Sequence, residues 1–250
     1  MARYQAVLAY DGTLFNGFQR QAEGRTVQGE VETALRRIGW KGSSILAAGR
    51  TDSGVHALGQ VIAFDLDWTH PPDALLRAIN ANLPADVAVR KVKPTLGGFH
   101  PRFDAVARRY RYRIFFQPVR DPLRERYVWR VWPPMDLDRL HRAASQLIGE
   151  YDFRAFGTPP RPGGGTVRTI YEAVWVQDRD TFVFEIEANA FLYRMVRRIV
   201  QLQVEIGQRK PVERVTQFLT GELPGMVQGL APPHGLALIM VRYPNSCRSG

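Results

Sequence analysis

One short segment places a carboxylate and a guanidinium between two glycines. It reads Gly49-Arg50-Thr51-Asp52-Ser53-Gly54-Val55-His56-Ala57. Gly49 and Gly54 give backbone freedom on either side of Asp52, and the apolar runs 45–48 and 61–64 are typical of flanking strands. Asp and Gly also favour ordinary tight turns for purely local reasons. The pattern alone therefore fits either a plain turn or a catalytic loop that projects the Asp52 carboxylate, with Arg50 beside it.

The net charge favours a polyanionic partner. Lys and Arg number 34 against 24 Asp and Glu, which gives +10 with neutral histidines, and only four of the basic residues are lysines. Arginine adds bidentate hydrogen bonding and planar stacking to the neutralisation of phosphates. We therefore expect a nucleic-acid partner, against the alternative of a merely soluble basic protein.

A second segment alternates basic and apolar side chains. Arg109-Tyr110-Arg111-Tyr112-Arg113-Ile114-Phe115-Phe116 has the period of two that is typical of a half-buried strand. One face would carry three arginines and the other most of the aromatics, which we expect in the core. An aromatic that stacks on a base would have to lie at the open end of this strand, and that position is held by Tyr110.

The composition argues against several classes of protein. At 250 residues, 45% hydrophobic and 23% charged, the chain is expected to be globular. It has no apolar run near the roughly 18 residues of a membrane span and no signal-peptide core, so we expect it in the cytoplasm. The single cysteine, Cys247, excludes an intramolecular disulfide. The five histidines lack the spacing of a zinc site and no carboxylate cluster suggests magnesium, so no metal is expected.

The periodicity predicts a mixed α/β chain of two ferredoxin-like halves, 1–96 and 97–250, each in the order β-α-β-β-α-β. Joined edge to edge, they would share a largely antiparallel sheet with a basic central cleft. For the first half we expect strands at 3–10, 45–48, 61–64 and 87–92 and helices at 27–38 and 72–81. For the second we expect strands at 106–116, 168–176, 181–188 and 236–243, helices at 136–147, 191–206 and 211–219, and a flexible loop at 161–165.

The segment 189–200 combines an apolar stripe with arginines at helical spacing. Arg194, Arg197 and Arg198 lie on the face opposite Leu192, Met195, Val196, Ile199 and Val200. These arginines would either line the cleft or be solvated opposite a core stripe, and the spacing does not choose between the two.

Along nearly its whole length the chain resembles the tRNA pseudouridine synthase A family. The Asp52 loop is the most specific of five segments that occur in the expected order. The other four are Tyr10-Asp11-Gly12-Thr13 with Gly17-Phe18-Gln19-Arg20-Gln21, Phe99-His100 before Arg102-Phe103, Ala107-Arg108-Arg109-Tyr110-Arg111-Tyr112, and Asn189-Ala190-Phe191 with Met195-Val196-Arg197.

The resemblance implies a homodimer that converts uridines at positions 38, 39 and 40 in the anticodon arm of tRNA into pseudouridine, without metal or organic cofactor. It makes Asp52 the catalytic carboxylate and Tyr110 the aromatic that contacts the target base. It also makes Arg197 the ionic partner of Asp52, and we expect Arg50 in the pocket of the flipped nucleotide. Asp52 can serve as a nucleophile or as the base that removes a sugar proton, and the sequence does not separate these routes.

Two other classes of function account for less of the sequence. An RNA-binding protein without chemistry would leave Asp52 and its glycines without a role, and 109–116 lacks the glycines of the RNP1 pattern. A metal-dependent phosphoesterase would need several carboxylates near its metal. An RNA isomerase is therefore favoured. Its tRNA surface is expected to draw on the segments 108–113 and 194–198 and on Arg124, Arg126 and Arg130.

Overall fold

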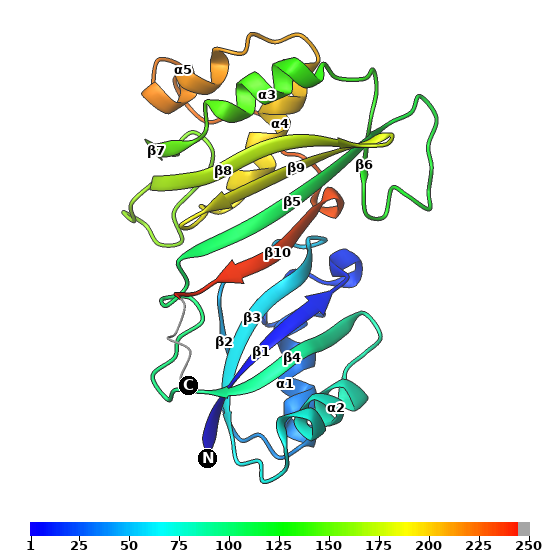
Figure 1. Cartoon of the computed structure of the whole chain (residues 1–250), viewed down its shortest axis with the longest axis vertical. Coiled ribbons are helices and arrows are strands. Elements are labelled where there is room, and N and C mark those ends of the chain that lie inside the picture. The colour runs from blue at the N-terminus through cyan, green and yellow to red at the C-terminus, as the bar shows by residue number, and fades with distance from the viewer. Residues whose placement is uncertain (245–250) are drawn as a thin grey trace. The chain divides into compact units, whose positions relative to one another are not determined.

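The computed structural model describes residues 1–244, which form two compact units (Figure 1). Among the described residues, unit 1 comprises Met1–Val106 and 237–244, and unit 2 comprises Ala107–Leu236. Each combines helices with a largely antiparallel sheet, which confirms the predicted fold class. Cys247 lies outside the described residues.

Unit 1 has the ferredoxin-like arrangement. Its elements are β1 (Ala2–Tyr10), α1 (Val27–Arg37), β2 (Leu46–Ala47), β3 (His56–Leu66), α2 (Pro72–Asn82) and β4 (Val87–Thr95), with a short 3-10 turn η1 (Gly12–Leu14). The strands lie in the order β4-β1-β3-β2 and every neighbouring pair is antiparallel. Helices α1 and α2 pack together, and α2 lies against β4.

The helices of unit 1 form where their sequence signals place them. Thr26 caps α1 by accepting a hydrogen bond from the N–H of Gly29, and Val27, Val31 and Leu35 are buried at helical spacing. The first residue of α2 is Pro72, which suits a helix start because it has no N–H to satisfy. Both helices match the prediction to within one residue.

Unit 2 begins with β5 (Ala107–Phe116) and carries its strands in the order β5-β9-β8-β7, all antiparallel, with β6 parallel beside β5. Helices α3 and α4 pack together and α3 lies against β8. Residues 161–165 form an irregular, exposed connection between β7 and β8. The remaining bounds are β6 (Trp129–Val131), α3 (Leu137–Ser145), β7 (Gly149–Asp152), β8 (Val167–Asp178), β9 (Thr181–Ala188), α4 (Met195–Gly207), α5 (Arg214–Thr220) and a 3-10 turn η2 (Pro233–Gly235).

The division between the units differs from the predicted one in two places. The first boundary falls at Val106, not near Gly97, because the Val106 N–H donates to the Arg242 carbonyl (2.8 Å) and the Tyr243 hydroxyl to that of Pro101 (2.8 Å). Strand β10 (Leu236–Arg242), predicted as the last strand of the second half, lies almost entirely in unit 1 and pairs in parallel with β3.

Candidate active site

The Asp52 loop connects β2 to β3 in unit 1. Strand β3 starts at His56, five residues before the predicted start of the apolar run, so it follows the loop directly. The Val55 N–H donates to the Asp52 carbonyl (3.1 Å) and closes a tight turn in which Gly54 has a φ of 77°. Asp52 is half-buried and Arg50 is exposed.

Residues 10–18 hold this loop on both sides of Asp52. The hydroxyls of Tyr10 and Thr51 are hydrogen-bonded (2.8 Å), and the Phe18 N–H donates to the Thr51 carbonyl (3.1 Å). On the other side, the Ser53 hydroxyl donates to the Phe15 carbonyl (3.0 Å). The residues before and after Asp52 are thus fixed, which limits the positions that its carboxylate can take.

Two glycines permit this close approach. A Cβ at Gly12 would lie 2.1 Å from the Val55 carbonyl oxygen, and one at Gly17 would lie 2.9 Å from that of Thr51. Gly17 also has a φ of 91°, which L side chains rarely adopt. The sequence shows both glycines but not their partners, so their role in supporting the loop was not predicted.

Gly17→Ala is therefore expected to lower the free energy of unfolding by about 1–3 kcal/mol, because the added methyl group meets both a positive φ and the Thr51 backbone. Gly39→Ala is the matched control, since Gly39 has a φ of 95° and open space around its Cβ position. Urea denaturation measures both variants. Equal losses would show that the crowding against Thr51 contributes nothing.

His56 is a further supporting residue that the sequence did not single out. It is buried at the start of β3, and the Gly12 N–H donates to its Nδ1 (3.0 Å). Asp11 Oδ1 lies 3.2 Å from the same nitrogen, and only a protonated Nδ1 could donate to it. The direction of the Gly12 N–H assigns Nδ1 as the acceptor and places the ring proton on Nε2. This bond ties the first turn after β1 to the end of the Asp52 loop.

In unit 2, the two tyrosines of β5 have different surroundings. Tyr112 is fully buried, its hydroxyl donates to the Pro232 carbonyl (2.7 Å), and burial raises its pKa well above the usual value. Tyr110 is half-buried, and its ring meets that of Phe191 edge-on at 5.2 Å between centroids. The prediction that most of these aromatics lie in the core is confirmed for Tyr112. Tyr110, in contrast, keeps part of its surface accessible to solvent.

Arg197 lies in the first turn of α4. Its side chain is buried, with a relative exposure of 9%, and its Nε–H donates to the Ala231 carbonyl (2.7 Å). Of the neighbouring arginines, Arg194 is exposed and Arg198 is half-buried. The three arginines therefore do not form the common face that the spacing suggested: Arg197 points inward and Arg194 outward.

The predicted start of α4 at Phe191 was four residues too early. Arg194 has a φ of 63°, a left-handed conformation that does not occur inside an α-helix. Tyr193 forms a β-bridge with Thr158. The Asn189 side chain accepts hydrogen bonds from the backbone N–H groups of Thr169 and Ala190. The backbone here therefore forms hydrogen bonds to a side chain in place of helical ones.

The basic face of β5 is largely neutralised within unit 2. Arg109 bonds Glu172, Glu185 and Glu187, and these carboxylates raise its pKa, with the bond to Glu187 as the largest cause. Arg111 bonds Glu185 as well (2.5 Å). The charge that these two residues would offer to RNA is therefore partly balanced by carboxylates of the same unit.

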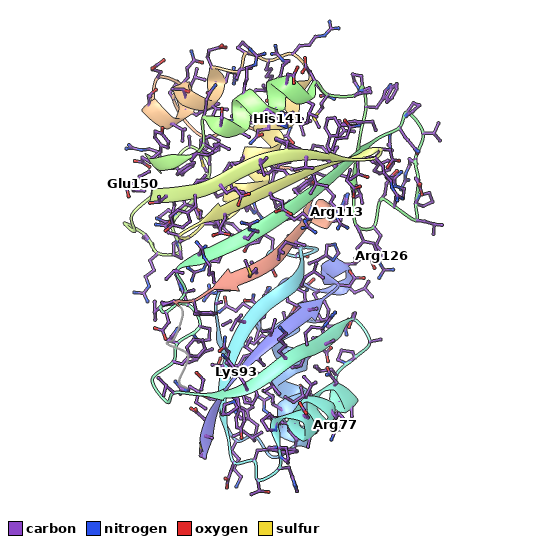
Figure 2. All side chains as sticks on the ribbon, in the orientation of Figure 1. Arg77, Lys93, Arg113, Arg126, His141 and Glu150 are labelled. Carbon is purple, nitrogen blue, oxygen red and sulfur yellow. The ribbon has the colours of Figure 1, made fainter. Side chains whose placement is uncertain are left out.

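Downstream of β5, in the loop that follows it and in β6, some arginines are paired and others are exposed. Arg124 pairs with Asp180 (2.5 Å) and Arg130 with Glu125 (2.9 Å). Arg126 and, on β5, Arg113 are exposed (Figure 2). These two side chains keep the accessible charge that the sequence predicted for the segment.

Residues 1–244 contain no group of three or more His, Cys, Asp or Glu side chains placed to hold a metal ion. Within the same residues, no helix has the length and apolar character needed to cross a membrane.

Known proteins match the chain along its whole length. A family model described as tRNA pseudouridine synthase matches residues 6–104 and 143–244. A tRNA pseudouridine synthase A from Limosilactobacillus fermentum is 39% identical over 100% of this chain and 99% of its own length. Proteins of the same name are 40% identical in Halalkalibacterium halodurans (94% of this chain, 90% of the relative) and 43% identical in Brevibacillus brevis (97% and 100%).

Proposed function

Because the chain belongs to the tRNA pseudouridine synthase A family and is an isomerase, we propose that it converts uridines at positions 38, 39 and 40 of the tRNA anticodon arm into pseudouridine, with Asp52 as the essential catalytic carboxylate. The observation that supports Asp52 is its loop, which residues 10–18 hold on both sides of this half-buried residue. We further propose a homodimer that acts in the cytoplasm without a cofactor.

The reaction defines what the site must do. The bond between uracil N1 and ribose C1′ breaks, the base turns, and C1′ bonds to C5. A proton leaves C5 and another is taken up at N1, so the product is an isomer of the substrate. The base must stay bound while it is detached from the sugar, which requires extrusion from the stack and a pocket that grips the ring. An ionised Asp52 would act on the sugar or the base as nucleophile or as general base.

We assign Arg197 as the partner that holds Asp52 charged and oriented. A guanidinium favours the ionised form of a nearby carboxylate through charge and through hydrogen bonds. The Arg197 Nε–H donates to the Ala231 carbonyl, which fixes the direction of the guanidinium, and a buried guanidinium would be shielded from water and salt if it pairs with Asp52 as proposed. Arg50, exposed two residues before Asp52, is assigned to the pocket of the flipped nucleotide.

Tyr110 is proposed to stack on the target uracil and to serve in proton transfer at the base. Tyr110→Phe keeps the ring and its edge-on contact with Phe191, so we expect tRNA affinity to be unchanged and turnover to fall by about 10²-fold or more. Tyr112→Phe is the matched control, because its hydroxyl is committed to Pro232. If Tyr110→Phe forms product at the wild-type rate, only the ring contributes.

Product mapping tests the proposed positions. Unmodified tRNA transcripts are incubated with the purified protein, and pseudouridine is located by chemical labelling and primer extension. We expect the modification at positions 38, 39 and 40 and its loss wherever that uridine is replaced by cytidine. Pseudouridine found only outside the anticodon arm would refute the assigned specificity while leaving the isomerase activity in place.

A further inference from the structure

The turn at 99–104 in unit 1 presents an aromatic side chain to solvent without a packing reason. Phe103 is 72% exposed, although the same turn buries Pro101 and half-buries Phe99. Phe99-His100 and Arg102-Phe103 belong to the segments that carry the family resemblance, and the roles proposed above use none of these residues. A large exposed apolar ring on an ordered turn is a candidate for binding.

The backbone of this turn is anchored at several points. The Tyr243 hydroxyl donates to the Pro101 carbonyl (2.8 Å), and the Tyr243 ring meets that of Phe99 at 5.1 Å between centroids. Arg3 donates to the Phe99 carbonyl (3.2 Å) and is itself held by two hydrogen bonds to Asp65 (2.8 and 2.7 Å), which raise the pKa of Arg3. The conformation of the turn is therefore preformed by contacts within the chain.

The exposed ring is also held in place. The His100 ring lies 4.2 Å from that of Phe103 between centroids, at a tilt of 37°. The backbone N–H of Arg102 donates to His100 Nδ1 (3.2 Å), which orients the imidazole, and the backbone N–H of His100 donates to the Asp104 carboxylate (2.9 Å), which holds the turn. The Arg102 guanidinium lies 5.8 Å from the Phe103 ring centroid. An immobilised ring loses little conformational entropy when a partner stacks on it.

The surroundings indicate the chemistry of that partner. Arg102 adjoins the ring, and the strand that precedes the turn, β4, exposes Lys91 and Lys93, of which Figure 2 labels Lys93. An exposed aromatic ring beside basic side chains suits a nucleotide, whose base stacks while its phosphate meets the cation. An apolar protein partner would meet a single ring with the charged side chain of Arg102 next to it.

The turn lies far from the catalytic carboxylate. Strand β1 joins the two regions, because Arg3 near its start binds the turn and Tyr10 at its end binds Thr51 of the Asp52 loop. Seven residues of extended chain separate Arg3 from Tyr10, which corresponds to about 23 Å. A base on Phe103 is therefore not the target uridine or its immediate neighbour.

We propose that the turn 99–104 is a second RNA-binding element, in which Phe103, positioned by His100, stacks on an unpaired tRNA base outside the anticodon loop while Arg102 contacts its phosphate. The proposal rests on the proposed function for the identity of the RNA. It assigns these residues to the affinity for whole tRNA and not to the chemical step at Asp52.

Binding of full-length tRNA by Phe103→Leu tests the proposal, since leucine keeps an apolar side chain but removes the π-face. We expect the Kd, measured by filter binding, to rise by about tenfold, while turnover at saturating tRNA stays unchanged. Phe103→Trp is expected to retain wild-type affinity. Leu96→Ala is the matched control, because Leu96 is 83% exposed near the turn but cannot stack.

Three results would overturn the proposal. An unchanged Kd for Phe103→Leu removes the stacking role. A change in oligomeric mass by analytical ultracentrifugation would instead make the ring a contact with a second copy of the chain. A photo-crosslink from p-benzoylphenylalanine at position 103 that maps to nucleotides 38–40 would contradict the distal placement, whereas we expect it elsewhere in the tRNA. These binding readouts need no turnover, so they remain decisive even if the proposed reaction fails.

Discussion

Asp52→Asn is expected to abolish pseudouridine formation while leaving the fold and the affinity for tRNA intact. Asparagine matches aspartate in shape but has neither the negative charge nor the basicity that a nucleophile or general base needs. The described tethers of the loop run through Thr51, Ser53 and the backbone, so the substitution leaves them in place. We expect the single-turnover rate to fall by about 10⁴-fold or more.

Nucleoside chromatography of digested tRNA gives this rate directly. Ser53→Ala is the neighbouring control, since it removes one hydrogen bond to the Phe15 carbonyl but no charge, and we expect it to keep its rate to within about tenfold. An unchanged melting temperature and Kd for Asp52→Asn would exclude a general loss of structure. A rate near the wild-type value would remove Asp52 from the chemistry.

Arg197→Ala is expected to reduce turnover at saturating tRNA by about 10²-fold and to change the Kd for tRNA little, because a buried guanidinium that orients a carboxylate acts on the reaction and not on phosphates. Arg197→Lys keeps the charge but cannot reproduce the fixed fork of the guanidinium, so it should recover only part of the rate.

Arg194→Ala is the matched control, because it distinguishes the loss of a positive charge from the loss of a buried guanidinium. It removes the same charge from the residue that precedes α4, but Arg194 is exposed, so we expect weaker tRNA binding with turnover retained. Arg197→Ala also leaves the Ala231 carbonyl without this donor, at a cost of about 1–3 kcal/mol in stability, which thermal unfolding would report. Equal effects of the two substitutions on turnover and affinity would contradict the role assigned to Arg197.

Local patterns predicted those parts of the fold that depend on local chemistry. The burial of Val27, Val31 and Leu35 follows directly from helical spacing, and the alternation along β5 separated Tyr112 from the arginine face. The Asp52 loop was recognisable because its glycines and charged residues stand between two apolar runs. Its supporting segment, 10–18, was visible only through the family resemblance, since a sequence does not show which backbone a missing Cβ would meet.

The features that escaped prediction are set by partners distant in sequence. The parallel pairing of β10 with β3 joins Ala237 to His56, and no periodicity encodes it. Arg109 and Glu187 face each other only through the register of β5 and β9, so the sequence showed the charge of the arginine without its neutralisation. The start of α4 was misplaced because the Asn189 side chain binds N–H groups outside the helix.

Tritium release from uracil C5 tests the central claim most directly, because the new bond to C1′ forms at that carbon and its hydrogen must leave. Unmodified tRNA labelled at C5 of its uridines is incubated with the wild-type protein and with Asp52→Asn. We predict release by the wild type and none above background by the variant, with equal tRNA binding. Tight binding without release by the wild type, or equal release by both proteins, would contradict it.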